Sequence, residues 1–252
     1  MGKAECIGKK VLVSGATPFD PQNRIKPLKF AACEATNEQY RVFEAGRAGS
    51  RFELVVTSKS GQTSTLPMST VDSMDRRAAK EAAKGDVKTV DKQTIIASRR
   101  PPLEAKLAGD DQPVANVNAK DAEDYCKAQR DENGKPGRLP TNDEWEKMAR
   151  GPKGFNYGTE DGTLKCGKNA SCSVDFDANA SSVVGSFAAG GFGTYDTVGN
   201  VWEWTKESNG DTSIRGGSWY YLNTGFLRAG YRYSYHPDDR HVVGIRCVWP
   251  QD

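Results

Sequence analysis

The sequence predicts an α+β fold that is rich in loops, with short antiparallel strands and a few helices. Two capping boxes, Thr36–Gln39 and Thr141–Glu144, each precede apolar residues at helical spacing. Short apolar runs bounded by Gly or Pro indicate strands elsewhere. After Arg150, Gly, Asn, Ser and aromatic residues dominate. The last part of the chain is therefore expected to be held by local turns and buried tryptophans.

The N-terminal part predicts two strands and a helix. Val11–Val13 and Phe30–Cys33 are the expected strands, and the segment between them contains three prolines. The first capping box is followed by Tyr40 and Phe43, three residues apart. This spacing places both rings on one face of a helix that begins at the box.

Residues 47–112 are expected to form an insertion within a single domain that spans residues 1–252. Strands are expected at 52–57 and 88–98. Between them, residues 73–84 are rich in helix-forming and charged residues but poor in large apolar ones. That composition predicts a solvated surface helix.

Two further helices and three short strands are expected after the insertion. Asn118 can cap a helix that runs to Ala128, and the second capping box opens a helix with Trp145 and Met148 on one face. The expected strands lie at 183–184, 201–204 and 244–249.

Composition excludes several classes of function. The chain has 252 residues, of which 37% are hydrophobic, with 35 basic and 33 acidic residues. No apolar run is long enough to span a membrane, and the net charge of +2 gives no general field for nucleic acid. His236 and His241 are the only histidines, so a three-histidine metal site cannot form. Without a visible signal peptide, a cytoplasmic or phage-associated protein is expected, the alternative being that a leader was removed; the oligomeric state is undetermined.

The six cysteines are spread along the chain, and none forms a Cys-x-x-Cys motif. Free, buried thiols are therefore expected. The alternative is a small loop closed by Cys166 and Cys172, which requires an oxidising compartment.

Residues 196–204 are dense in oxygen ligands. Asp196, Asn200 and Glu203 supply carboxylate and amide oxygens, which Ca²⁺ prefers. A structural calcium ion is thus the one cofactor the residues suggest, and no organic cofactor is expected. The alternative is that Trp202 and Trp204 belong to the core and the polar groups satisfy a tight loop.

The C-terminal segment is unusually rich in tyrosine. Five of the nine tyrosines lie within residues 220–235, interleaved with Gly, Ser, Asn and Thr. Such a mixture is typical of binding surfaces such as antibody paratopes. A core aromatic cluster is the alternative. The arginines threaded through this part of the chain are expected to be scaffold, bonded to carbonyls and carboxylates: Arg215, Arg228, Arg232, Arg240 and Arg246.

Six motifs in order resemble the formylglycine-generating-enzyme, or sulfatase-modifying-factor, family, over roughly residues 28–250. They are Ala35–Tyr40, Pro113–Val117 with Asp121–Cys126, Gly137–Glu146, Gly193–Trp204, Arg215–Trp219 and Gly244–Arg246. The resemblance implies a C-type-lectin-like fold and a family calcium site in the Asp196–Glu203 loop.

The family's oxidases modify a sulfatase cysteine with two cysteines and copper. Those thiols fall in the stretch that here runs from Trp219 to Phe226, which contains no cysteine. The resemblance therefore does not imply an enzyme. An oxidase with a relocated thiol at Cys247 remains one alternative, and a static accessory lectin-like domain is another.

Within this fold, the chain is most similar to the variable proteins of diversity-generating retroelements, in which a reverse transcriptase rewrites a C-terminal segment. Fixed landmarks such as Gly216–Trp219, Leu227–Ala229 and Gly244–Arg246 frame gaps filled by the expected mixture of residues. Ile245 replaces the usual Phe.

This resemblance implies a non-catalytic protein that binds a protein or glycan ligand through a variable region at residues 214–249. It implies no nucleic-acid partner. The expected ligand-binding residues are Tyr220, Tyr221, Asn223, Thr224, Gly225, Phe226, Gly230, Tyr231, Tyr233, Ser234, Tyr235, His236, His241, Val242 and Val243.

Overall fold

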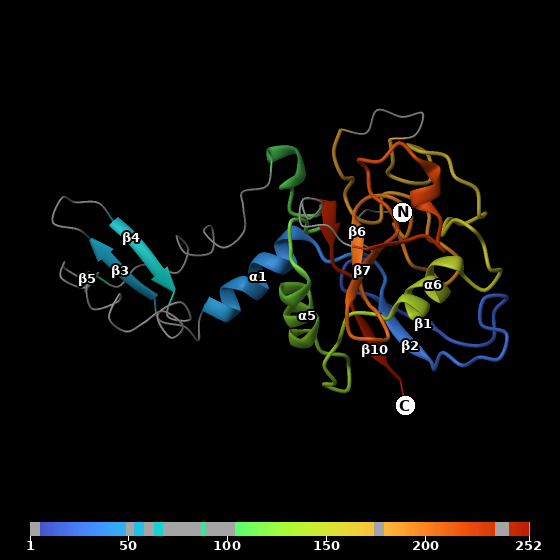
Figure 1. Cartoon of the computed structure of the whole chain (residues 1–252), viewed down its shortest axis with the longest axis horizontal. Coiled ribbons are helices and arrows are strands. Elements are labelled where there is room, and N and C mark those ends of the chain that lie inside the picture. The colour runs from blue at the N-terminus through green and yellow to red at the C-terminus, as the bar shows by residue number, and fades with distance from the viewer. Residues whose placement is uncertain are drawn as a thin grey trace. The chain divides into compact units, whose positions relative to one another are not determined.

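A computed structural model of the chain describes residues 6–48, 53–57, 63–67, 87–88, 104–173, 179–234 and 242–251. It divides the chain into two compact units, residues 1–40 together with 103–252, and residues 41–102. Figure 1 shows the order of the elements. The expected insertion at 47–112 overlaps the second unit.

The larger unit combines short strands, short helices and long loops. Its strands are β1 (Lys10–Val13), β2 (Leu28–Ala31), β6 (Trp202–Lys206), β7 (Thr212–Arg215), β8 (Arg232–Ser234), β9 (Val243–Gly244) and β10 (Val248–Pro250). Its helices are α5 (Ala119–Ala128), α6 (Asn142–Arg150) and the 3₁₀ turns η1 (Ala105–Leu107) and η2 (Thr224–Leu227). The helix α1 (Asn37–Ala48) begins in this unit. The predicted loop-rich α+β class is confirmed.

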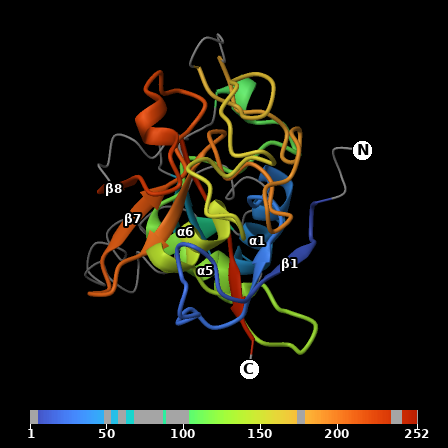
Figure 2. The same ribbon diagram turned by 90° about the vertical axis from the view of Figure 1, so that its right-hand side faces the viewer.

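Two sheets organise the described part of the larger unit. The first has the order β1-β2-β10 and is antiparallel, so the end of the chain pairs beside its beginning, with Val248 opposite Phe30. The second has the order β8-β7-β6-β9, in which only β9 runs parallel to its neighbour, with Val243 opposite Trp202. Figure 2 shows β7 and β8 side by side, with α6 between them and β1.

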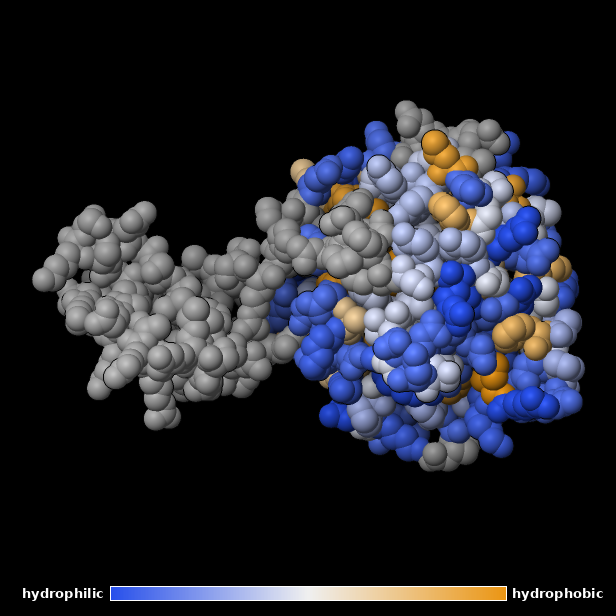
Figure 3. Space-filling view, viewed as in Figure 1, coloured by the Kyte–Doolittle hydropathy of each residue, from blue (hydrophilic) through white to orange (hydrophobic). Residues whose placement is uncertain are grey.

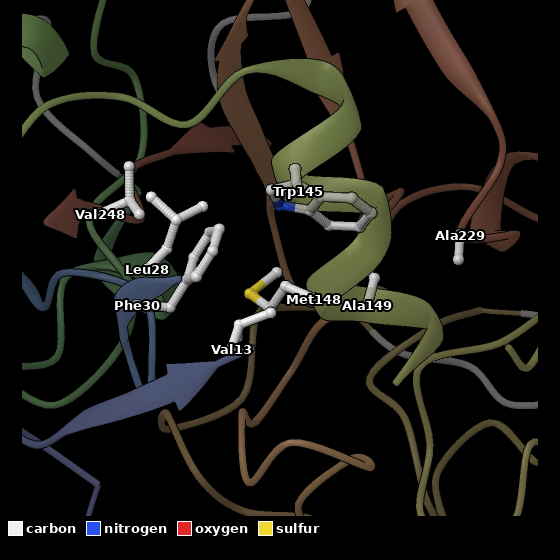
Figure 4. Packing of buried hydrophobic residues seen from close by; sticks show 8 residues of the cluster. All are labelled: Val13, Leu28, Phe30, Trp145, Met148, Ala149, Ala229 and Val248. Atoms are coloured by element: carbon white, nitrogen blue, oxygen red, sulfur yellow. The ribbon is translucent and has the colours of Figure 1, made fainter. Parts of the chain in front are cut away.

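Helix α6 packs between these sheets. Thr141 and Glu144 form the predicted capping box at its start. Trp145 and Met148 of α6 are fully buried and belong to one hydrophobic cluster. Figure 4 shows the Met148 side chain reaching from α6 toward Phe30 and Val13 of the first sheet. The other buried members of this cluster are Val13, Leu28, Phe30, Ala149, Ala229 and Val248. The three-residue spacing of Trp145 and Met148 explains why both reach one core.

The smaller unit contains one described sheet. It consists of β3 (Glu53–Thr57), β4 (Thr63–Pro67) and β5 (Val87–Lys88) in the order β4-β3-β5, and both pairings are antiparallel. The strand expected at 52–57 is thus present from Glu53. The surface helix expected at 73–84 lies outside the described residues, as does most of the strand expected at 88–98.

Three expected strands differ from the structure. The strand expected at 30–33 lies at Leu28–Ala31, because its alternation of buried and half-buried residues begins at Leu28. Residues 183–184 lie in a loop and form no strand. Val184 is nevertheless buried, and its backbone N–H donates to the Asp111 carbonyl at 2.9 Å. The run expected at 244–249 is divided between β9 and β10.

The prediction of free thiols is wrong. All six cysteines are paired, as Cys6–Cys33, Cys126–Cys247 and Cys166–Cys172. Only the third pair was a sequence-level alternative. The other two join residues 27 and 121 positions apart, which only the tertiary fold brings together.

The visible face of the larger unit is mostly hydrophilic, with scattered hydrophobic residues (Figure 3). Within the described part of the chain, no helix has the length and apolar character needed to cross a bilayer.

Candidate ligand-binding face

The tyrosine-rich segment rests on two buried arginines. The first, Arg215, ends β7 and is 2% exposed. Its Nη2 donates to Glu146 Oε2 at 2.6 Å, and its Nη1 donates to the carbonyl of Tyr231 at 3.0 Å. Its guanidinium lies over the Trp145 ring, 5.4 Å from the centroid. Arg215 therefore ties the backbone of the tyrosine-rich segment to helix α6.

The second, Arg246, is fully buried. Its Nε and Nη2 donate to both Glu203 carboxylate oxygens at 2.7–3.0 Å, and its Nη1 donates to the carbonyls of Ala31 and Ala32. Glu203 also accepts from Trp145 Nε1 at 2.6 Å. This network links β6, β2 and α6, as expected for a scaffold arginine.

Two more carboxyl groups lie beside this network. Glu34 Oε2 is 3.9 Å from Arg246 Nη2, and both Glu34 and Asp196 are buried. Burial, and then the charge of Asp196, raise the pKa of Glu34 well above its ordinary value. Burial also raises the pKa of Asp196 to about 6. One buried guanidinium thus faces three carboxyl groups.

The predicted calcium ligands do not fit a calcium ion. Both Glu203 oxygens are occupied by Arg246 and Trp145. The Asn200 side chain accepts from the Ser182 backbone N–H at 2.9 Å and donates to Glu34. Only Asp196 Oδ1 has no hydrogen-bond partner among the three residues. No cluster of three or more Asp, Glu, His or Cys suited to a metal occurs in the described residues.

These residues instead hold a tight loop, which was the alternative interpretation. Asp196 and Asn200 have positive φ angles of 56° and 58°. Asp196 Oδ2 accepts from the Gly185 N–H at 2.6 Å, so the side chain fastens a neighbouring loop. Trp202 and Trp204 are core residues, each 1% exposed.

Two glycines with unusual backbone angles lead from β7 into the tyrosine-rich segment. Gly216 and Gly217 have φ angles of 94° and 77°, which side-chain-bearing residues rarely adopt. A Cβ on Gly216 would lie 3.1 Å from the Trp145 ring. The glycine pair therefore lets the chain pass over Trp145 and deliver Trp219, whose N–H donates to the Asn200 carbonyl at 2.8 Å.

Beyond Trp219 the aromatic rings form a connected cluster around Trp202. Tyr233 stacks on Trp202 with centroids 5.9 Å apart, and Tyr221 meets it edge-on at 5.7 Å. Tyr231 lies 6.2 Å from Trp202 and 5.0 Å from Phe226. These four outer rings are half-buried. They form a platform whose fixed base, Trp202, belongs to β6.

Above this platform the 220–224 loop is exposed. Tyr220 is 56% exposed and stands edge-on to both Trp219 and Tyr221. Leu222 is 73% exposed. Asn223 Oδ1 accepts from the Gly225 N–H at 2.8 Å and so caps the 3₁₀ turn η2 that follows. The loop thus presents apolar side chains from a locally fixed backbone.

The structure divides the expected ligand-binding residues into four groups. Exposed are Tyr220, Asn223, Thr224, Gly230 and Ser234; half-buried are Tyr221, Gly225, Phe226, Tyr231 and Tyr233. Tyr235, His236 and His241 lie outside the described residues. Val242 and Val243 are fully buried, so their assignment to the surface is wrong: β9 pairs with β6 inside the second sheet. Leu222 was missed because a lone leucine in sequence favours a core position.

The scaffold interpretation also needs one correction. Arg215 and Arg246 are scaffold, but the side chain of Arg228 is exposed and has no ion-pair partner among the described residues. Arg232 pairs with Glu207 at 3.0 Å on the surface. Arg240 lies outside the described residues.

The disulfides bear on the chemistry of the site. A copper oxidase of the kind the sequence resembles uses two thiols, whereas each of the six cysteines here is in a disulfide. Cys247, the one candidate for a relocated thiol, is bonded to Cys126. The residues present do not fit a thiolate-bound copper ion.

Comparisons with curated proteins find enzymes and an inactive relative. The chain is 29% identical over 173 residues to hercynine oxygenase of Mycolicibacterium smegmatis, covering 55% of this chain and 38% of that protein. It is 34% identical over 110 residues to mouse formylglycine-generating enzyme, covering 38% and 27%. It is 38% identical over 121 residues to bovine inactive C-alpha-formylglycine-generating enzyme 2, covering 42% and 38%. The matches thus span at most 38% of these relatives' lengths.

Comparisons with solved structures support the fold. CarF aligns with a TM-score of 0.57 at 18% identity, over 97% of this chain and 98% of its own. PvdO from Pseudomonas aeruginosa aligns with a TM-score of 0.56 at 21% identity, over 96% and 91%. Treponema denticola variable protein 1 aligns at 0.42 and 20% identity, over 99% and 80%, which is too low to support an argument.

A family model decides the assignment. Residues 7–251 match the sulfatase-modifying factor enzyme 1-like domain, which is nearly the whole chain. The order of the sequence motifs and the buried Arg246–Glu203 network lie within that match. The chain therefore belongs to the sulfatase-modifying factor enzyme 1-like family.

Proposed function

We propose that this protein is a non-catalytic ligand-binding protein whose segment 214–249 is diversified by a retroelement. One observation carries the proposal. Most landmark side chains of the segment, including Trp219, Leu227 and Ile245, are buried, whereas gap residues such as Tyr220 and Thr224 are exposed. The exceptions are the exposed landmark Arg228 and the buried gap residues Val242 and Val243. Substitution at the exposed gap positions would change the surface and leave the frame in place.

The frame is suited to this task because hydrogen bonds to backbone and buried charges hold it. Arg215 binds the carbonyl of Tyr231, and the Asn200 carbonyl accepts from the Trp219 N–H. Neither contact depends on the side chain of an exposed gap residue. A rigid platform also reduces the entropy that is lost when a ligand binds.

A protein or a glycan is the ligand expected for this face, because tyrosine rings supply contact area at low entropic cost. The three disulfides support a protein that works in an oxidising compartment rather than the reducing cytosol. We therefore propose an oxidising compartment in place of the cytoplasm, which the sequence offered together with a phage-associated location.

The first test is to sequence the DNA that flanks the gene. We expect a near-copy of the codons for 214–249 beside a reverse-transcriptase frame, differing almost only at adenines of the copy. The differing codons should encode exposed positions such as Tyr220 and Thr224 and spare buried ones such as Trp219. Absence of any copy would instead leave a static accessory domain.

A formylglycine-generating-type oxidase is the second candidate, favoured by the enzymes among the relatives. It predicts copper-dependent oxidation of a cysteine peptide by the purified chain, lost in the variant Cys247→Ser. We expect no turnover, because Cys247 is held in a disulfide. Turnover that depends on Cys247 would replace the binding proposal.

A further inference from the structure

The exposed loop of the ligand-binding face is unusually apolar. Four large hydrophobic side chains are strongly exposed among the described residues, and two of them, Tyr220 and Leu222, are two positions apart in this loop. The remaining two, Leu12 and Val42, belong to other parts of the chain. Half of the strongly exposed large apolar side chains of the described residues thus fall in one three-residue stretch, as expected where a partner is contacted.

The backbone that carries these side chains is constrained on both sides. Ser218 Oγ accepts from the Tyr220 N–H at 3.4 Å, and the Asn223 side chain caps η2 directly after Leu222. Ser173 Oγ donates to the Trp219 carbonyl at 2.5 Å. The loop is therefore prepared for contact, and ordering it on binding costs little.

The charged residues within the segment that carries this loop are all arginines. The segment Gly216–Ser234 contains no carboxylate and two arginines. Arg232 is neutralised by Glu207, and the nearby Lys106, which lies over the Trp219 ring, is neutralised by Glu104 at 3.0 Å. Arg228, which caps the C-terminal end of η2, keeps its charge unpaired among the described residues.

We infer that the Tyr220–Leu222 loop and Arg228 bind a protein segment that carries an aliphatic or aromatic side chain beside a carboxylate. The apolar residue would contact Tyr220 and Leu222, and the carboxylate would pair with Arg228. An uncharged glycan has no carboxylate to pair with the charge of Arg228. This inference rests on the proposed function and narrows its ligand to a protein.

The test uses the full chain, immobilised, and a random twelve-residue peptide library displayed on phage. We expect enriched peptides to combine Asp or Glu with a large apolar residue. A synthetic enriched peptide should bind Arg228→Glu and Leu222→Ser at least about tenfold more weakly than the wild type, since charge pairs and apolar anchors dominate small interfaces. Arg24→Glu, a change at an exposed arginine outside the segment, is the matched control and should bind normally.

Exchanging the charges of the two partners tests whether Arg228 pairs directly with the acidic residue of the peptide or affects binding only through the overall charge of the protein. A peptide with its acidic residue changed to Lys should regain binding to Arg228→Glu and lose binding to the wild type. Enriched peptides without acidic residues, or binding that is indifferent to Arg228, would overturn the inference.

A parallel binding assay on an array of defined oligosaccharides distinguishes failure of the protein-ligand inference from failure of the proposed binding function. Oligosaccharide binding that requires Tyr220, with no peptide enrichment, would overturn the protein ligand and leave the binding function standing. Peptide and oligosaccharide binding that are both absent, or that are both unchanged by substitutions in the 220–234 segment, would overturn the binding function as well.

Discussion

Arginine has two opposite roles in this protein. Arg246 is fully buried and makes six hydrogen bonds to Glu203, to Ala31, to Ala32 and to Tyr195. Arg228 is exposed, and its charge is balanced by no described residue. Both arginines belong to landmark motifs of the sequence, Gly244–Arg246 and Leu227–Ala229. Burial therefore decides whether an arginine here stabilises the fold or is left facing solvent.

Arg246→Met is expected to lower the free energy of unfolding by about 3–5 kcal/mol, because it leaves Glu203 buried without its charge partner. Chemical denaturation at neutral pH measures the change. Arg228→Met, the exposed counterpart, should shift stability by less than about 0.5 kcal/mol. Adding Glu203→Gln to Arg246→Met should recover part of the loss; no recovery would contradict the ion-pair explanation.

Asp196 should make stability depend on pH. Its folded pKa of about 6 lies above the ordinary value of 3.8. The native state therefore binds the proton more tightly, and the resulting stabilisation is present below pH 4 and is lost as the pH rises through 6. Between pH 4 and pH 7, wild type should lose about 2–3 kcal/mol relative to Asp196→Asn. Denaturation curves at both pH values test this, with the exposed Asp211→Asn as the control.

At the scale of elements, the β6 strand and the tyrosine-rich segment form one unit. Trp202 of β6 contacts Tyr221, Tyr231 and Tyr233, although about twenty to thirty residues separate it from them. The sequence left a binding surface and a core cluster as alternatives for these tyrosines. The structure combines a core cluster with an exposed surface, since the inner rings pack on Trp202 and Tyr220 is more than half exposed.

Tyr233→Ala should therefore lower the free energy of unfolding by about 1–3 kcal/mol, through loss of its stacked contact with Trp202. Tyr220→Ala should cost less than about 1 kcal/mol, because its ring is more than half exposed. Thermal and chemical denaturation compare the two variants. Equal losses would show that the segment is not divided into a platform and an exposed loop.

At the scale of the larger unit, the disulfides join distant parts of the chain. Cys126–Cys247 links α5 to the loop before β10, whereas Cys166–Cys172 closes only a local loop. Closing a long loop removes more conformational freedom from the unfolded chain. The Cys126–Cys247 bridge should therefore contribute more to the free energy of unfolding than the Cys166–Cys172 bridge.

Replacing both cysteines of the long-range pair by alanine should cost about 5 kcal/mol, against about 2 kcal/mol for the same change in the Cys166–Cys172 pair. Denaturation under oxidising conditions measures the difference. Thiol titration of the unfolded, unreduced wild type should find no free thiol. Six titrated thiols in correctly folded protein would contradict the three pairings.

The sequence by itself determined the local elements and the family. The capping box at Thr141 predicted α6, and Asn118 predicted the start of α5, because a side chain that binds a backbone N–H within three residues needs no tertiary context. The motif order identified the fold, and the tyrosine-rich composition located a candidate face.

Tertiary structure alone decided which side chains of that face are available. It buried Val243 beside Trp202, exposed Leu222, and paired Glu203 with Arg246 rather than leaving its oxygens for calcium. It also brought Cys126 to Cys247 across 121 residues. The physical reason is common to these cases: burial and pairing depend on contacts between residues distant in the chain, which no local pattern encodes.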